Sequence, residues 1–275
     1  MGSNKPKRAV SPEEIEQYRE MGVIKLASIF DMAWIDHLRA ATDVAMTQPG
    51  PYAEEYAKGP GRFFGDLDIA RRVAPFREFV HDSPAAEIVG TLMESSKVSF
   101  FYDQLLVKEP GTPERTPWHQ DQPYWAVRGR QVSSLWLPLD HVSKDCSLKF
   151  VRGSHLWSEH NPHHFIDDSP YAGTGLPELP DIDAEPDKYV CLAWELEPGD
   201  CLVFQAMIVH GSGGNLSLQE RRRAFSTRWT GDDARYDRRN GELAIPTFDP
   251  GLADGAEMDC EYFPVIWRRS AQRPS

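Results

Sequence analysis

Two histidines and one aspartate have the types and the spacing of a metal site. His119 and Asp121 lie two residues apart in Pro117-Trp-His-Gln-Asp121, and His210 ends an apolar, strand-like run. Residues i and i+2 of an extended segment project to the same face, so this imidazole and carboxylate can hold one ion together. A second histidine completes one face of an octahedral ion and leaves the opposite positions open, as in non-haem Fe(II) oxygenases. The His-x-Asp spacing also occurs in ordinary surface ion pairs, so other segments must support this hypothesis.

The composition excludes several classes of protein. Hydrophobic residues make up 40% and charged residues 26% of the 275 residues, which excludes wholesale disorder. The chain has 30 lysines and arginines against 42 aspartates and glutamates, a formal net charge of −12. Nucleic acids and anionic membranes require a basic surface, so we expect neither as a partner.

The N-terminal segment and the cysteines predict a cytoplasmic protein. The basic residues at the start are followed by Ser11-Pro-Glu-Glu14 rather than by an apolar segment, so no signal peptide is expected. No run approaches the roughly 18 apolar residues that span a bilayer. The four cysteines form no Cys-x-x-Cys pair, and Cys191 and Cys201 lie in apolar stretches that favour reduced, buried thiols.

The elements that must position these residues begin with helices, up to about residue 95. The capping box Ser11-Pro-Glu-Glu14 starts one helix, which Gly22 ends. Asp31 caps a second helix, and Ser83-Pro84 opens a third. The segment from Gln48 to Gly65 is rich in Gly and Pro and lacks periodicity, so it is interpreted as a loop that contributes to a lid.

From residue 99 onwards the pattern predicts strands separated by turns. The expected strands cover residues 99–107, 133–139, 148–151, 189–194, 201–204, 207–209 and 224–229. Many short strands preceded by helices favour a β-sandwich or barrel braced by helices on one face. Residues 156–187 have no clear period, and a loop of this length is usually functional or disordered.

Four segments carry a family resemblance when they are taken together. They are Thr116-Pro-Trp-His-Gln-Asp-Gln, Ser147-Leu-Lys-Phe-Val-Arg-Gly-Ser-His155, His210-Gly-Ser-Gly-Gly-Asn215 and Arg221-Arg-Arg-Ala-Phe-Ser-Thr-Arg-Trp229. In this order and spacing, between about residues 11 and 236, the chain resembles the phytanoyl-CoA dioxygenase family of Fe(II)- and 2-oxoglutarate-dependent oxygenases. The resemblance implies a fold that is mainly β with supporting helices, a cupin-like double-stranded β-helix or jelly roll. The length and the lack of a linker predict a single domain over residues 1–275, with a helical part at about 11–95, the jelly-roll core at about 99–236 and a C-terminal extension at 237–275.

The resemblance assigns His119, Asp121 and His210 as ligands of Fe(II), with 2-oxoglutarate as cosubstrate and O2 as oxidant. It also places an arginine about a dozen residues after His210. A guanidinium suits this position because its fork forms two parallel bonds to the far carboxylate of 2-oxoglutarate. The family usually has this arginine two residues before an alanine, which selects Arg222. Because the loop here is one residue longer than usual, Arg221 stays open.

Strand alternation predicts the direction of each side chain in this last segment. One face carries Arg222, Ala224, Ser226 and Arg228. The opposite face carries Arg221, Arg223, Phe225, Thr227 and Trp229. A small alanine and a serine beside Arg222 suit a crowded interior, whereas the other two arginines of the cluster are expected on the surface.

Three further residues resemble cosubstrate contacts, each with a simpler explanation. Ser212, two residues after the distal histidine, matches a hydroxyl that reaches the cosubstrate carboxylate, but is also a turn former. Gln104 resembles a donor to the end nearest the metal, but is also a polar residue at a strand edge. Trp136 resembles an aromatic residue that lines the cosubstrate site, and Leu-Trp-Leu equally describes a core aromatic.

Other conspicuous residues are assigned with less specificity. Tyr124, Trp125 and Arg128 follow the metal segment directly and either face the substrate or pack in the core. His155 is expected to end a strand rather than bind iron. The histidines within residues 160–164 lack the spacing of a zinc site and are expected in a solvated loop.

The resemblance implies oxidation of an aliphatic C–H bond, coupled to conversion of 2-oxoglutarate and O2 into succinate and CO2. Halogenating relatives have Ala or Gly in place of the carboxylate, so Asp121 favours hydroxylation, desaturation or ring formation. Two other classes compete: a non-catalytic jelly-roll relative that binds a metal or small ligand, and a cupin-type metalloenzyme without a cosubstrate. The second would require a further metal-binding Glu and His, which the sequence lacks near the first site.

The expected partner is a small-molecule substrate, and the expected assembly is a monomer or homodimer. The net charge disfavours a CoA thioester, although Arg128 and Arg130 form a local basic pair that prevents its exclusion. The identity of the substrate is not defined by the sequence.

Overall fold

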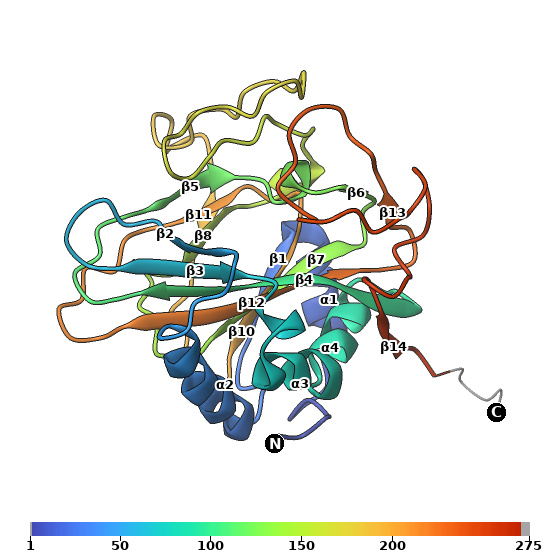
Figure 1. The fold of residues 1–275 in the computed structure, drawn as a ribbon, viewed down its shortest axis with the longest axis horizontal. Helices are drawn as coiled ribbons and strands as arrows, with labels where there is room; N and C mark the ends of the chain where they lie inside the picture. The colour runs from blue at the N-terminus through green and yellow to red at the C-terminus, as the bar shows by residue number, and fades with distance from the viewer. Residues whose placement is uncertain (1, 271–275) are drawn as a thin grey trace.

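A large antiparallel sheet crosses the middle of the molecule (Figure 1). In the computed structural model, which describes residues 2–270, it has eight strands in the order β1-β10-β7-β12-β4-β3-β2, and β14 also pairs with β4. The strands are β1 (Val23–Leu26), β2 (Ala53–Glu55), β3 (Phe63–Leu67), β4 (Lys97–Lys108), β7 (Val132–Pro138), β10 (Cys201–Gln205), β12 (Arg222–Thr230) and β14 (Val265–Arg268).

A smaller sheet lies over one face of the large sheet. Its order is β5-β11-β8-β9, with strands β5 (Thr116–His119), β8 (Leu148–Val151), β9 (Cys191–Leu192) and β11 (His210–Ser212). Strands β6 (Val127–Arg128) and β13 (Arg235–Tyr236) form a separate pair. One hydrophobic cluster joins Phe150 of the small sheet to Trp136, Phe204 and Ala224 of the large sheet, so the two sheets pack face to face. The predicted fold class, a mainly β jelly roll with supporting helices, is confirmed.

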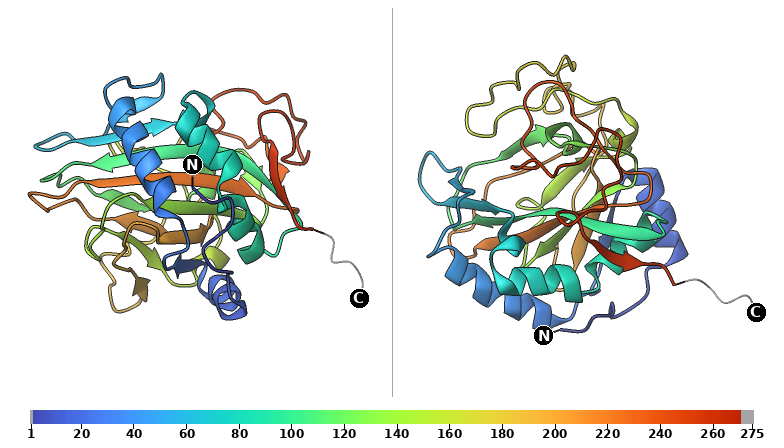
Figure 2. Two further views of the ribbon diagram at one scale, coloured as in Figure 1. Left: turned by 90° about the horizontal axis from the view of Figure 1, so that it is seen from below. Right: turned by 45° about the vertical axis from the view of Figure 1, so that its right-hand side comes forward.

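Helices cover the other face of the large sheet (Figure 2). They are α1 (Pro12–Met21), α2 (Met32–Ala45), α3 (Ala74–Asp82) and α4 (Ala85–Leu92), and three short 3-10 helices are η1 (Ile69–Arg71), η2 (Gln122–Tyr124) and η3 (Ser154–Leu156). The helix ends that the sequence predicted for α1 and for the start of α2 are confirmed. Ser11 caps α1 in a capping box, Gly22 ends it in the left-handed conformation, and Asp31 caps α2.

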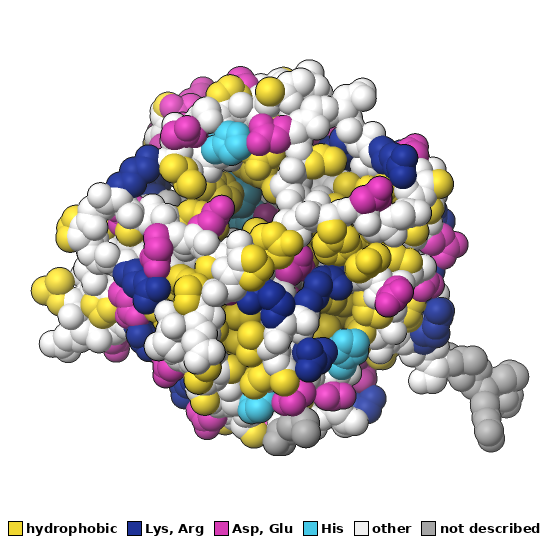
Figure 3. Space-filling model, in the orientation of Figure 1, with side chains coloured by type: hydrophobic (Ala, Val, Ile, Leu, Met, Phe, Trp, Pro, Cys, Tyr) yellow, Lys and Arg dark blue, Asp and Glu magenta, His cyan; other side chains and the backbone are white. Residues whose placement is uncertain are grey.

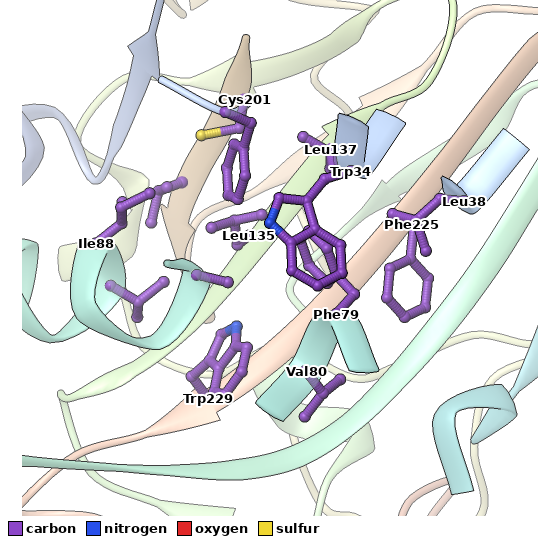
Figure 4. Close-up of a cluster of buried hydrophobic side chains, with 14 of the residues drawn as sticks. Trp34, Leu38, Phe79, Val80, Ile88, Leu135, Leu137, Cys201, Phe225 and Trp229 are labelled. Atoms are coloured by element: carbon purple, nitrogen blue, oxygen red, sulfur yellow. The ribbon is translucent and has the colours of Figure 1, made fainter. Parts of the chain in front are cut away.

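The largest hydrophobic core lies between these helices and the sheet (Figure 4). Trp34 of α2 and Phe79 of α3 pack there with Leu135 of β7 and with Phe225 and Trp229 of β12. Because side chains alternate along a strand, the residues of β7 and β12 that do not face the helices point into the space between the two sheets.

The interpretation of residues 48–65 as a loop is wrong in part. Strand β2 and the start of β3 lie in this segment and extend the large sheet beyond β4. Helix α3 and strand β1, both before residue 95, are further elements that the sequence did not indicate. The pairing partners of β1 and β3 are β10 and β4, which are distant in sequence, so no local pattern marks them.

Two predicted strands near the small sheet also differ. Residues 207–209 form a buried turn rather than a strand, and β11 begins only at His210. Residues 189–194 contribute only the two-residue β9, which is not buried, so the prediction of a buried Cys191 is wrong. Cys201 is buried as predicted, and no cysteine forms a disulfide. Apolar composition indicates burial of Cys201 correctly because its strand is central, whereas β9 is an edge strand with one neighbour.

The long segment over residues 156–187 folds back above the small sheet, at the top of Figure 1. Several of its side chains, including Phe165 and Ile166, line the main cavity, so it contributes to the site rather than only connecting strands. Within residues 2–270, the helices are all too short or too polar to cross a bilayer. The predicted compartment, assembly state and lack of nucleic-acid binding stay predictions.

Candidate active site

The three predicted metal ligands converge at the end of the small sheet. His119 ends β5, His210 begins β11, and the two residues are direct antiparallel partners. Asp121 follows β5 and is the residue that precedes η2. Its Oδ1 atom lies 3.5 Å from Nε2 of His119 and 3.9 Å from Nε2 of His210. One ligand atom from each residue lies within 4.8 Å of the others, so the three can bind one ion.

Backbone and side-chain contacts orient all three ligands. Nδ1–H of His119 donates to the carbonyl of Pro117 at 2.9 Å, and Nδ1–H of His210 donates to that of Ile208 at 3.0 Å. The Ser134 hydroxyl donates to Oδ2 of Asp121 at 3.1 Å. Both Nε2 lone pairs are therefore left free toward the carboxylate, which is how metal-ligating histidines are commonly held.

The charges of the ligands suit a cation. Burial, with the neighbouring His119, lowers the pKa of His210 to about 3, so this imidazole is neutral at physiological pH. Burial alone would raise the pKa of Asp121, but its interactions with His210, His119 and the guanidinium of Arg228 outweigh it, so the pKa lies well below its usual range. A carboxylate and a neutral imidazole are both in the protonation state that metal binding requires.

A cavity of about 600 Å³ opens beside the triad. Figure 3 shows this face of the molecule, where hydrophobic side chains gather around a hollow. Aromatic residues supply much of its wall: Tyr56, Phe63, Tyr102, Tyr124, Trp125, Trp136, Phe165, Tyr171 and Phe204. The volume and the apolar wall are typical of a site for a small organic molecule.

Arg222 points into this cavity, as the alternation predicts. Its side chain is 2% exposed, and its guanidinium lies 5.6 Å from the centre of the Trp136 ring. One N–H donates to the carbonyl of Cys146 at 3.3 Å, whereas Nε has no acceptor. In the described part of the chain, no carboxylate pairs with Arg222, so its charge is available to an anionic ligand.

The neighbouring arginines point the other way and are already paired. Arg221 contacts Glu109 and lies 2.8 Å from Asp43 of α2. Arg223 forms two bonds to Asp140, at 2.8 and 3.0 Å. The extra loop residue has therefore not shifted the strand register, and of the two alternatives only Arg222 faces the cavity.

The three weaker sequence candidates all line the same cavity. Ser212 is buried and its oxygen accepts from the Lys108 Nζ at 3.1 Å. The Trp136 Nε1–H has no acceptor. Gln104 directs its amide oxygen to Arg228 at 3.3 Å. The structure thus brings these residues together, and their roles stay predictions.

Some of the remaining sequence candidates line the cavity and others do not. Tyr124 and Trp125 line the cavity, but Arg128 lies outside it and is half-exposed beside acidic residues. His155 lies in η3, its Nε2 contacts the carbonyl of Arg19, and it belongs neither to the triad nor to the lining of the cavity. The solvated-loop interpretation of residues 160–164 is incomplete, because His163 and His164 reach the cavity wall. They do so because the long loop folds inward, which its irregular sequence did not indicate.

Two buried cations of the cavity region were missed as site residues. Lys108 ends β4 and is fully buried, and Arg228 lies on β12 and is 5% exposed. Strand alternation placed Arg228 on the inward face, but a buried arginine without a counter-ion is recognised only from its surroundings. Lys108 has no such signal, since a terminal lysine of a strand is usually solvated.

Two packed antiparallel sheets with a His-Asp-His cluster beside an apolar cavity define a double-stranded β-helix with a mononuclear metal site. The chain belongs to the phytanoyl-CoA dioxygenase family, whose model matches residues 7–224. The family predicted from the sequence is thereby confirmed, and with it the enzyme class, a non-haem iron dioxygenase. The implied cofactors, Fe(II), 2-oxoglutarate and O2, agree with the donor set of the triad.

Individual relatives are distant. The dioxygenase lolE1 of Epichloe uncinata is 23% identical over 237 residues, covering 82% of this chain and 85% of its own. A probable phytanoyl-CoA dioxygenase of Caenorhabditis elegans is 23% identical over 229 residues, and these cover 82% of this chain but 65% of that protein.

Solved structures share the fold. The α-ketoglutarate-dependent carbocyclase SnoK from nogalamycin biosynthesis superposes with a TM-score of 0.74 at 19% identity, covering 94% of this chain and 97% of SnoK. The epimerase SnoN, in complex with Fe3+, α-ketoglutarate and nogalamycin RO, gives 0.72 at 18% identity, over 93% and 98% of the chains.

Proposed function

We propose that this protein is an Fe(II)- and 2-oxoglutarate-dependent dioxygenase that oxidises an aliphatic C–H bond of a small organic molecule. The observation that carries the proposal is a pairing of two features in one cavity. The ligand atoms of His119, Asp121 and His210 lie within 4.8 Å of one another, and Arg222 is buried in the same cavity without a counter-ion among residues 2–270. A metal ion and a carboxylate are the complements of these two features.

The residues present fit both groups. The triad offers two imidazole nitrogens and one carboxylate oxygen, a donor set that suits non-haem Fe(II). The Nε of Arg222, the Nε1 of Trp136 and the hydroxyl of Ser226 are buried and have no partner, although each belongs to a cavity-lining residue. Buried polar groups are normally satisfied, so this set is complementary to a ligand that accepts hydrogen bonds.

When bound, Fe(II) with 2-oxoglutarate and O2 would supply the oxidising power, with release of succinate and CO2. The chain would contribute position and electrostatics. His119, Asp121 and His210 would hold the metal, and Arg222 would bind the far carboxylate of the cosubstrate. The aromatic wall excludes water from the reacting atoms.

Asp121 bears on the type of reaction. Because its carboxylate fills a ligand position and is held by Ser134, no open position remains there for a halide. We therefore favour hydroxylation, desaturation or ring formation over halogenation.

The test is an anaerobic titration followed by turnover. Purified protein with Fe(II) and 2-oxoglutarate is expected to develop the visible charge-transfer absorption of a chelated 2-oxo acid, and then to form succinate on exposure to O2. The His119→Ala variant serves as a control and should do neither. Absorption without succinate, under all substrate mixtures tried, would favour the non-catalytic relative. Absence of both in the wild type would favour a metal site that does not use this cosubstrate.

A further inference from the structure

Arg228 lies at the metal end of the cavity, apart from Arg222. The two arginines share one face of β12 and are six residues apart, which separates their Cα atoms by about 20 Å along an extended strand. Arg228 pairs in register with Ser134, the residue whose hydroxyl donates to Asp121. Its positive charge contributes to the low pKa of Asp121, as expected for a neighbour of the triad.

The Arg228 guanidinium is held in place but not neutralised. One N–H donates to the carbonyl of Ser226 at 3.0 Å and another to the amide oxygen of Gln104 at 3.3 Å. Its flat face covers the Tyr102 ring at 4.7 Å. The Nε–H has no acceptor, and over residues 2–270 no carboxylate forms a salt bridge with this side chain. A rigid, buried cation of this kind is built to receive an anion.

The charge balance of the loaded site indicates which anion is missing. With Fe(II), the 2-oxoglutarate dianion, Asp121 and Arg222 in place, the formal charges cancel. The Lys108 Nζ is already enclosed by the carbonyls of Glu114 and Gly213 and by the Ser212 hydroxyl, so this cation is not open to a second anion. Within residues 2–270, Arg228 then remains as a buried cation of this cavity that has a free N–H and no carboxylate within salt-bridge distance. A single negative charge on the organic substrate would compensate it.

We propose that Arg228, held by Gln104, forms a subsite for a carboxylate of the organic substrate, which makes this protein an oxygenase of apolar or aromatic monocarboxylic acids. The inference rests on the proposed function and names its substrate class. The apolar part of such an acid would lie against the aromatic wall that continues from Tyr102 to Tyr124 and Trp125. The carboxylate would accept the free Nε–H and an adjacent N–H of Arg228 as a parallel pair of bonds.

The experiment compares an acid with its neutral isostere. Protein is loaded with Mn(II), which does not support turnover, and with 2-oxoglutarate. The dissociation constants of 3-phenylpropionate and 3-phenylpropionamide are then measured by calorimetry. The wild type is expected to bind the acid at least about tenfold more tightly than the amide, the ratio expected from a hydrogen-bonded charge. Arg228→Met should reduce this ratio to near one, and Arg228→Lys should restore part of it.

Two matched variants separate this subsite from its neighbours. Arg115 also lines the cavity but is largely exposed and paired with Asp183, so Arg115→Met should keep the wild-type ratio. Arg222→Met should weaken the binding of 2-oxoglutarate. The ratio of the dissociation constants of the acid and the amide should stay unchanged.

The outcomes that overturn the proposal are distinct. If the wild type binds the acid and the amide equally well, the proposal is wrong. This result needs no variant, so the test remains valid even if Arg228→Met does not fold. A larger loss of 2-oxoglutarate affinity than of acid affinity in Arg228→Met also overturns it, because the arginine would then bind the near carboxylate of the cosubstrate. Failure of the proposed function gives a different result from failure of this subsite. The Mn(II)-loaded wild type would then not bind 2-oxoglutarate, but it would still prefer the acid to the amide.

Discussion

Arg222 and Lys108 are direct partners across β12 and β4, and neither has a carboxylate partner within residues 2–270. The Lys108 Nζ instead contacts the carbonyls of Glu114 and Gly213 at 2.9 and 2.8 Å, and the Ser212 hydroxyl at 3.1 Å. Two cations in contact in a dry environment cannot both stay charged at low cost. Burial and the charge of Arg222 lower the pKa of Lys108, so Lys108 is the group expected to release its proton.

Lys108 is therefore expected to make stability depend on pH. Burial, and then the charge of Arg222, lower its pKa from 10.5 to about 6 in the folded protein. Between pH 6 and pH 10.5 the unfolded chain binds a proton that the folded chain does not, so stability rises with pH in this range. For one proton the slope is about 1.4 kcal/mol per pH unit. Urea unfolding at pH 7, 8 and 9 should show this rise in the wild type and a flatter profile in Lys108→Met. Parallel profiles would contradict a neutral Lys108.

Removal of any one ligand of the triad should abolish the metal site but keep the fold. His119→Ala, Asp121→Ala and His210→Ala are each expected to lose Fe(II) binding and Fe(II)-dependent succinate formation, because the remaining two ligands cannot define the site. Thermal unfolding in the presence of a chelator should stay close to that of the wild type, since the strands pack without the metal. His155→Ala, a histidine in η3 outside the triad, is the control and should retain metal. Succinate production at the wild-type rate by all three variants would rule out the assignment.

Arg222→Ala should specifically weaken the binding of 2-oxoglutarate. Truncation of one member of a buried charge pair costs about 2–5 kcal/mol, so the dissociation constant should rise thirty-fold or more. Arg222→Lys keeps the charge but loses the fork and should recover only part of the affinity. Titration of the cosubstrate against the Mn(II)-loaded protein measures both effects.

Arg221→Ala and Arg223→Ala are the controls for that prediction. Their side chains pair with Glu109, Asp43 and Asp140 on the helix side of the sheet, so affinity for 2-oxoglutarate should change less than about threefold. An Arg221→Ala variant as sensitive as Arg222→Ala would show that the strand register in solution is off by one.

Phe225→Ala should destabilise the sheet that carries both cavity arginines. Its ring packs in the helix-facing core, 4.9 Å from Phe76 and 5.6 Å from Phe79 between ring centres. Truncation of a buried phenylalanine costs about 3–5 kcal/mol, which urea unfolding would measure. Val44→Ala, at an exposed position on α2, should change the free energy of unfolding by less than about 0.5 kcal/mol. A similar small loss for Phe225→Ala would mean that this core is not closely packed.

Local patterns in the sequence determined much of this protein. The capping box at Ser11, the left-handed stop at Gly22 and the cap at Asp31 depend on neighbouring residues alone, and all three occur as predicted. The period of two along β12 placed Arg222 toward the cavity for the same reason, and the His-x-Asp spacing put two ligand side chains on one side of the chain.

Only the tertiary structure decided which groups those residues meet. Strand β14 pairs with β4 more than 150 residues earlier in the chain, and β2 and β3 extend the same sheet, although neither has a periodic sequence of its own. Within residues 2–270, Arg228 and Lys108 gain their significance because no carboxylate forms a salt bridge with either, and that depends on every element packed around them. Spacing along a chain determines the direction of a side chain, but burial and charge balance depend on contacts between distant segments, and these exist only once the two sheets have closed on each other.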